Sequence, residues 1–497
     1  MLETVREFGR LQLEAAGEAG EARAARRAWA TAYADRHRAG LSNRDQFATI
    51  DAIAVEEVNL ADELRDALAD GDRRALVELL SVLGLFWTIR GEHGRLIGMT
   101  GAIADAIRDW QPPPEVEDTT RAALVMTMMG AMVTDDRRSA PIRELLAQLG
   151  PGDGDPRLTG MVSMLLSYDR ADPAAFPPRL ERLATDPDPH VAAPARQMLA
   201  HARENVGDPA GAVEAAMGAL ALVRGDEGPW TSALLHTRLA DLTVNLGDTA
   251  AADEHARAAL PVMERLGATD DVLQLRALLV LCAIAEGRLE DAEAELEQVD
   301  AIDARGMLFG GIAFGQIGAA ELALARGDIT TGLRRYRECA AALAGMRLPG
   351  IETTGMEPWG VLGESIALGA HAYHAATDAD DAYARRRFAT SRERILRLLH
   401  AANPQLDYPV AGLALFALGA WGLLRDAAPV DDAIALLVLA ERFAYNRMIP
   451  TMAWERIAPH AEARAPGRIA ALRDGLGDRR PPELLDQARG LVERLPG

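Results

Sequence analysis

Three polar side chains in one helical stretch have a spacing that metal sites use. Glu364, His371 and His374 are separated by seven and three residues, so a helix would turn all three towards one side. Carboxylates and imidazoles bind zinc, but a structural site normally has a fourth ligand and a surrounding shell of hydrogen bonds. The sequence shows no fourth ligand. We therefore interpret these residues as a polar helix face and predict no metal site.

Two further patterns approach catalytic motifs without completing them. A glycine-rich run lacks the Gly-x-Gly-x-x-Gly order of a nucleotide loop and follows no strand, and close helix packing better explains its members, Gly306, Gly310, Gly311, Gly315 and Gly318. The segment Gly363-Glu364-Ser365-Ile366-Ala367 resembles a nucleophile elbow, but Ala367 replaces the second glycine. The chain also contains no lysine, which excludes a phosphate-loop or Schiff-base lysine. We predict a protein that is not an enzyme and carries no cofactor.

Composition places the chain among helical proteins without direct nucleic-acid contact. Its 497 residues are 49% hydrophobic but only 5% aromatic, and the net charge of −21 would repel a phosphate backbone. Cys282 and Cys339 lack the spacing of a disulfide framework, and no signal segment follows Met1. The longest apolar run, from Pro409 to Leu424, is shorter than the roughly 20 residues that span a bilayer. We predict a cytoplasmic protein that does not enter a membrane.

Four glycines recur at a constant interval and indicate the elements of the fold. Gly207, Gly247, Gly287 and Gly327 are each 40 residues apart, and Asp follows three of them. Glycine ends a helix in a left-handed conformation, and the next Asp caps a new helix by accepting backbone N–H bonds. Small residues recur five and twelve places after each glycine, except for Val299, and would let neighbouring helices approach closely. The pattern predicts helix-turn-helix hairpins.

This arrangement of leucine, small residue, glycine and aspartate is similar to that of tetratricopeptide (TPR) repeats. The resemblance implies an all-α fold, an α-solenoid of TPR-like repeats wound into a right-handed superhelix. The period of 40 exceeds the family's usual period of about 34, so longer helices or loops are expected.

The amino-terminal residues resemble a second family pattern. The opening Met1-Leu2-Glu3-Thr4-Val5-Arg6-Glu7-Phe8 is followed by an Arg-rich helix to Arg38, then by Glu56-Glu57-Val58-Asn59-Leu60 and by Phe86-Trp87. These segments resemble the region that follows the NTPase module in STAND-class bacterial transcription regulators, including AfsR-like and large LuxR-type proteins. We accordingly expect a helical connector over residues 1–45 and a TPR-like superhelical domain over residues 46–497.

The resemblance implies a sensor or interaction module that binds an effector or a protein in its groove. NTPase and DNA-binding domains would then be supplied in a longer chain or by a partner. A stand-alone TPR adaptor is the alternative, and an enzyme with a site in the groove is less favoured. A lysine-containing phosphate loop encoded immediately upstream would favour the regulator over the adaptor.

Aligning the units on their glycines predicts which side chains line the groove. Polar residues repeated along one wall could hold a peptide or small molecule by hydrogen bonds, although a solvated wall is polar in any case. A tryptophan beside Gly228 and Pro229 could cover the groove's mouth, or simply pack between repeats. The predicted ligand or partner contacts are Gln197, His201, Asn205, Trp230, Thr237, Asp241, Asn245, Gln274, Phe314, Glu321 and His371.

Overall fold

The protein folds as an assembly of α-helices. The structure, a computed structural model, describes residues 3–134, 139–168, 175–302, 311–347, 355–400 and 406–496. In these ranges there is no β-strand, only a single bridge between Asn43 and Glu227. None of the helices described there combines the length and apolar character of a bilayer crossing.

The chain divides into two compact units, and the first contains residues 1–167 and 224–230. Its helices are α1 (Glu3–Ala16), α2 (Ala19–Arg38), α3 (Gln46–Asp70), α4 (Arg73–Ile89), α5 (His93–Ala106), α6 (Glu117–Thr134), α7 (Ala140–Leu149) and α8 (Pro156–Ser167), with short 3₁₀ turns η1 (Ala39–Ser42) and η2 (Pro114–Val116). The helix α4 packs on α2, α3 and α6. The expected division between residues 1–45 and 46–497 stays a prediction.

The second unit contains residues 168–223 and 231–497. Its first helices are α9 (Phe176–Leu183), α10 (Pro189–Asn205), α11 (Pro209–Leu220), α12 (Pro229–Asn245), α13 (Thr249–Leu266), α14 (Thr269–Ala285) and α15 (Leu289–Asp300). They are followed by α16 (Gly311–Ala325), α17 (Ile329–Gly345), α18 (Pro358–His374), α19 (Asp378–His400), α20 (Tyr408–Leu424) and α21 (Val430–Arg442). The unit ends with η5 (Pro450–Met452), α22 (Trp454–Arg464), α23 (Arg468–Leu476), η6 (Pro481–Leu484) and α24 (Leu485–Arg494).

The helix hairpins predicted from the glycine spacing are confirmed. All four glycines lie between paired helices and have φ between 76 and 82°, the left-handed region that favours glycine. The carboxylates of Asp208, Asp248 and Asp328 accept the backbone N–H three residues later, at 2.9 to 3.1 Å. Each glycine thus ends one helix, and each of these aspartates caps the next, with three residues between the two helices.

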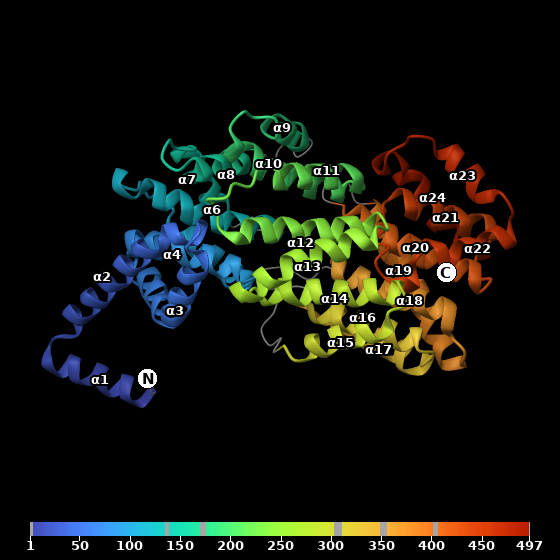
Figure 1. Cartoon of the computed structure of the whole chain (residues 1–497), viewed down its shortest axis with the longest axis horizontal. Helices are drawn as coiled ribbons and strands as arrows, with labels where there is room; N and C mark the ends of the chain where they lie inside the picture. The colour runs from blue at the N-terminus through green and yellow to red at the C-terminus, as the bar shows by residue number, and fades with distance from the viewer. Residues whose placement is uncertain are drawn as a thin grey trace. The chain divides into compact units, whose positions relative to one another are not determined.

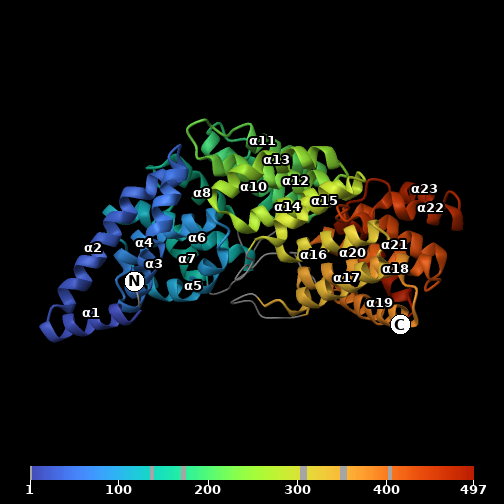
Figure 2. The same cartoon turned by 60° about the horizontal axis from the view of Figure 1, so that its bottom comes forward.

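Small side chains bring the helices of the second unit together. Ala212, Ala252, Ala292 and Cys339 are fully buried, as expected for the small residues five or twelve places after each glycine. Neighbouring hairpins pack on one another from α13 onwards, with α14 against α13, α15 and α16, and α18 against α17, α19 and α20. Figures 1 and 2 show α12, α13 and α14 side by side (green to yellow). Consecutive helices of this unit therefore pack in an all-α, repeat-like arrangement.

Early and late helices of this unit also meet. The helix α10 contacts α20, although they are some 200 residues apart in the chain. Pro481 lies against Gly207, where an added Cβ would approach the proline ring to 2.8 Å. The start of the unit thus lies beside α20 and the η6 turn.

Candidate functional site

An ion pair between two neighbouring repeats lies at the centre of the candidate site. Arg238 on α12 binds the carboxylate of Glu204 on α10 through Nη2, and the two side chains are 16 and 18% exposed. Asn245, two turns further along α12, donates from Nδ2 to Glu204 Oε1 at 3.2 Å. Both α10 and α12 therefore contribute polar groups to one place.

A second carboxylate joins this pair from the next turn of α12. Asp241 accepts a hydrogen bond from Gln274 Nε2 on α14 at 2.7 Å. Burial raises the pKa of Asp241 to about 6, against the opposing effects of Arg238 and Gln274. The repeat that begins with α14 thus contacts the repeat that begins with α12 through Gln274 and Asp241, both of which were predicted as ligand contacts.

Two further groups surround the ion pair. Burial, aided by the charge of Arg238, lowers the pKa of His201 to about 3, so this imidazole is neutral at physiological pH. Asp407 precedes α20, where its Oδ1 accepts the N–H of Val410 at 3.0 Å. Burial and the nearby carboxylate of Glu204 raise the pKa of Asp407 to about 6. Both groups are part-exposed, so solvent reaches them.

These residues form one cluster with more carboxylates than cations. At neutral pH it contains three carboxylates and a single guanidinium, so its net charge is negative. Such a group suits hydrogen-bond donors and positive charge on a ligand. We call it the Glu204/Arg238 cluster, and its members are His201, Glu204, Arg238, Asp241, Asn245, Gln274 and Asp407.

Three other predicted contacts lie on the same two helices. Gln197 is part-exposed on α10, and Asn205 is exposed at the end of that helix. Thr237 is 5% exposed, and its hydroxyl donates to the carbonyl of Ala233 at 3.0 Å. Their contact with a ligand stays a prediction, and Thr237 uses its donor within the helix.

Glu321 occupies the position equivalent to His201 and Asp241 but is covered by the chain itself. The residue is 2% exposed, and it accepts hydrogen bonds from the hydroxyl of Tyr336 and, at 3.2 Å, from the backbone N–H of Thr451. Burial raises its pKa. Thr451 belongs to η5, which packs on α14 and α18. A ligand would have to displace this turn before reaching Glu321.

His371 is likewise enclosed. It is fully buried on α18, with Nδ1 2.7 Å from the carbonyl of Ala367 and Nε2 3.3 Å from Nη1 of Arg337. Because a carbonyl only accepts and a guanidinium only donates, Nδ1 carries the proton and Nε2 is the acceptor. Burial lowers the pKa of His371 to about 4.

Two predicted contacts are not among the residues of the cluster. Trp230 belongs to the first unit, where its backbone N–H donates to Oε1 of Gln46 at 2.8 Å. Its role as a cover for the groove stays a prediction. The side chain of Phe314 lies outside the described residues, as do Gly306 and Gly310 of the glycine-rich run.

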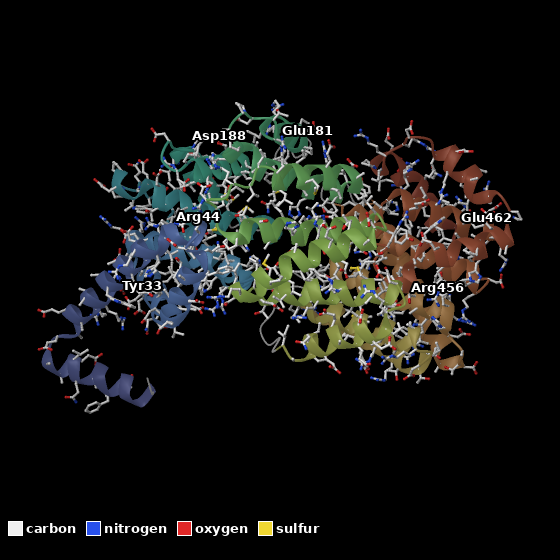
Figure 3. All side chains as sticks on the ribbon, in the orientation of Figure 1. Tyr33, Arg44, Glu181, Asp188, Arg456 and Glu462 are labelled. Atoms are coloured by element: carbon white, nitrogen blue, oxygen red, sulfur yellow. The ribbon has the colours of Figure 1, made fainter. Side chains whose placement is uncertain are left out.

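Glu364, His371 and His374, the three residues with the spacing of a metal site, each contact arginine side chains. Glu364 is 3.1 and 2.9 Å from guanidinium nitrogens of Arg387 and Arg394, and Nε2 of His374 accepts from Arg456 at 2.8 Å. Arg456 is labelled among the carboxy-terminal helices in Figure 3. In the part of the chain that the structure describes, no three His, Cys, Asp or Glu side chains are grouped to hold a metal ion.

A cleft of about 880 Å³ also lies within the second unit. Residues from α9 and α10 form one side, including Glu181, which Figure 3 labels on α9. The other side comes from α21, α23 and η6. Its arginines are partly neutralised: Arg473, for example, binds Glu441 through two nitrogens at 2.8 and 2.9 Å. None of the residues predicted as ligand contacts lines this cleft.

Three members of the Glu204/Arg238 cluster were not predicted from the sequence. Glu204 and Arg238 each lie one helical turn from a predicted residue, His201 and Asp241 respectively. Their counterparts 40 residues along are Val244 and Leu278, so a search for repeated polar positions passes over them. Asp407 lies far away in sequence, and the contact of α10 with α20 brings it near. Only the tertiary structure reveals it.

Comparison with known proteins adds no identification. No model of a protein family matches this chain, and no curated protein sequence matches it either.

Proposed function

We propose that this protein is a non-catalytic binding module that recognises an effector or a protein partner through the Glu204/Arg238 cluster. The observation that carries the proposal is the convergence of part-exposed polar groups from α10, α12, α14 and the turn before α20. Side chains of three successive hairpins contact one another there, so a bound molecule would touch several repeats at once. A right-handed TPR superhelix is the architecture we propose around it.

The resemblance of residues 1–110 to STAND-class regulators supports a regulatory role. On this proposal the helical repeats sense the effector, and an NTPase with a DNA-binding domain responds in a longer chain or as a partner. A stand-alone adaptor would need only the binding function. A lysine-containing phosphate loop encoded immediately upstream would favour the regulator.

Catalysis in the groove has one observation in its favour. The raised pKa values of Asp241 and Asp407 are of the kind that catalytic acids show. Buried ion networks shift pKa values in the same way, and here both carboxylates accept hydrogen bonds from this chain. Chemical turnover of a bound ligand, abolished in Asp241→Asn, would favour this second function.

A thermal-shift screen tests the binding function. A ligand bound only by the folded state raises the melting temperature, so we expect at least one metabolite or peptide to stabilise the full chain. The shift should be lost in Asp241→Asn and retained in Asp291→Asn, which makes the same chemical change on the exposed face of α15. If every stabilising ligand acts equally on the wild type and on Asp241→Asn, the cluster is not the binding site.

A further inference from the structure

The Glu204/Arg238 cluster has an unusual charge balance for a part-buried site. Arg238 is the only guanidinium there, and its ion pair is with Glu204. Asp241 and Asp407 each interact electrostatically with both members of that pair. Each accepts one hydrogen bond from the chain, from Gln274 or Val410, so carboxylate lone pairs remain for a further donor. The cluster is short of positive charge, and its one buried donor without a partner among the described residues is Nε of Arg238.

Asn245 provides independent evidence for a missing donor. Its side chain is 7% exposed and faces the cluster, because Nδ2 donates to Glu204 Oε1. The other end of the amide, Oδ1, is buried and has no hydrogen-bond partner among the described residues. A buried acceptor left without a donor destabilises the folded state, because it has lost its hydrogen bonds to water. A ligand that supplies an N–H group there would remove this destabilisation.

We propose that the Glu204/Arg238 cluster binds a protonated amine. The inference rests on the proposed function and names the ligand class: an ammonium group that donates to Asn245 Oδ1 and to the carboxylate of Asp241, which lies one turn away on α12, while Asp407 adds negative charge nearby. Arg238 holds Glu204 in place while the incoming cation balances the remaining negative charge.

Other ligand classes fit less well. An anion would meet three carboxylates against one guanidinium. A metal ion would need several carboxylate or imidazole ligands arranged around one point, and the described residues contain no such group of three. An ammonium group combines one positive charge with N–H donors, which matches the Asp241 carboxylate and the amide oxygen of Asn245.

The amine has two possible sources, a free small molecule or a lysine side chain of another protein. This chain contains no lysine, so it cannot fill the cluster with its own. The chemistry of recognition is the same in both cases, and two probes separate them.

Isothermal titration of the full chain with 1,4-diaminobutane and with N-acetyl-lysine amide tests the proposal. We expect at least one amine to bind near neutral pH, and the tighter of the two identifies the source. Two controls separate charge from donation: 1,4-butanediol carries no charge, and tetramethylammonium carries charge without an N–H donor. Neither should bind. Equal binding of tetramethylammonium and the amines would overturn the proposal.

Substitutions in the Glu204/Arg238 cluster test where the amine binds. We expect Asp241→Asn to weaken binding about tenfold or more, because it removes an ionised partner, while Asn245→Leu weakens it several-fold. Asp291→Asn, with the same change in net charge on an exposed face, should leave the affinity unchanged. Circular dichroism and thermal melting establish that each variant is folded. Equal loss in Asp241→Asn and Asp291→Asn would place the amine elsewhere.

The pH dependence gives a second readout. Asp241 faces Arg238 on its own helix, Glu204 on α10, and Gln274 and Asp271 on α14. Binding should strengthen as the pH rises from about 5 to about 7.5, because the carboxyl groups must lose their protons to hold a cation. Affinity that is independent of pH over this range contradicts a role for Asp241 and Asp407.

Failure of this inference is distinguishable from failure of the proposed function. A neutral or anionic ligand whose stabilising effect depends on Asp241 would overturn the amine and leave the binding function intact. Absence of any ligand or partner that depends on the cluster would overturn both.

Discussion

The residues of the Glu204/Arg238 cluster illustrate a conflict between local stability and binding. Asp241 is more basic than an ordinary aspartate, with a pKa of about 6, because burial disfavours its charged form. Arg238 and Gln274 compensate only in part. A carboxylate that the surrounding chain does not fully satisfy is a group available to a ligand.

Replacement of this carboxyl should stabilise the free protein at neutral pH. The native state retains a proton on Asp241 between pH 3.8 and about 6 that the unfolded chain has already lost, so wild-type stability falls as the pH rises through this window. The variant Asp241→Asn has no such group and can still accept the bond from Gln274. We expect a gain of no more than roughly 2–3 kcal/mol above pH 6 that shrinks towards pH 4.

Melting temperatures measured across this pH range check the prediction. Asp291→Asn is the matched control, because Asp291 is exposed and paired with Arg288 on the surface. A gain in Asp241→Asn that is larger at pH 4 than at pH 7 contradicts the assigned sign.

At the scale of the elements, the 40-residue repeat is built by glycine and aspartate together. Each glycine adopts the left-handed conformation that ends a helix, and Asp208, Asp248 and Asp328 satisfy an exposed N–H of the next. In the third repeat, Arg288 occupies the position of the aspartate. Its side chain forms ion pairs with Glu286 and Asp291 and does not cap α15.

Each capping aspartate should therefore stabilise the helix that follows it more than Arg288 stabilises α15. Replacement of Asp248 by Ala frees the N–H of Ala251 and should lower the stability of α13 by about 1 kcal/mol. Replacement of Arg288 by Ala removes only surface ion pairs, each worth a few tenths of a kcal/mol. Hydrogen exchange at the first amides of α13 measures the effect of Asp248→Ala, and exchange at the first amides of α15 measures the effect of Arg288→Ala. Faster exchange in Arg288→Ala than in Asp248→Ala would contradict the capping account.

On the scale of the whole molecule, sequence repeats predicted the hairpins of the second unit but not what covers them. The four glycine turns and the buried small residues follow from local propensities that tertiary contacts do not change. Equivalent positions in the repeats do not have the same exposure. The η5 turn covers Glu321, whereas His201 and Asp241 stay part-exposed. The cover comes from residues about 130 positions away, beyond any local pattern.

The central claim is that ligands bind across α10, α12 and α14. Hydrogen–deuterium exchange of the full chain, with and without a stabilising ligand from the screen, tests it most directly. We expect slower exchange in residues 197–205, 237–245 and 269–285, and no such change in Asp241→Asn. Slower exchange around the arginine-lined cleft at α21 and η6, or in the first unit alone, would contradict the claim.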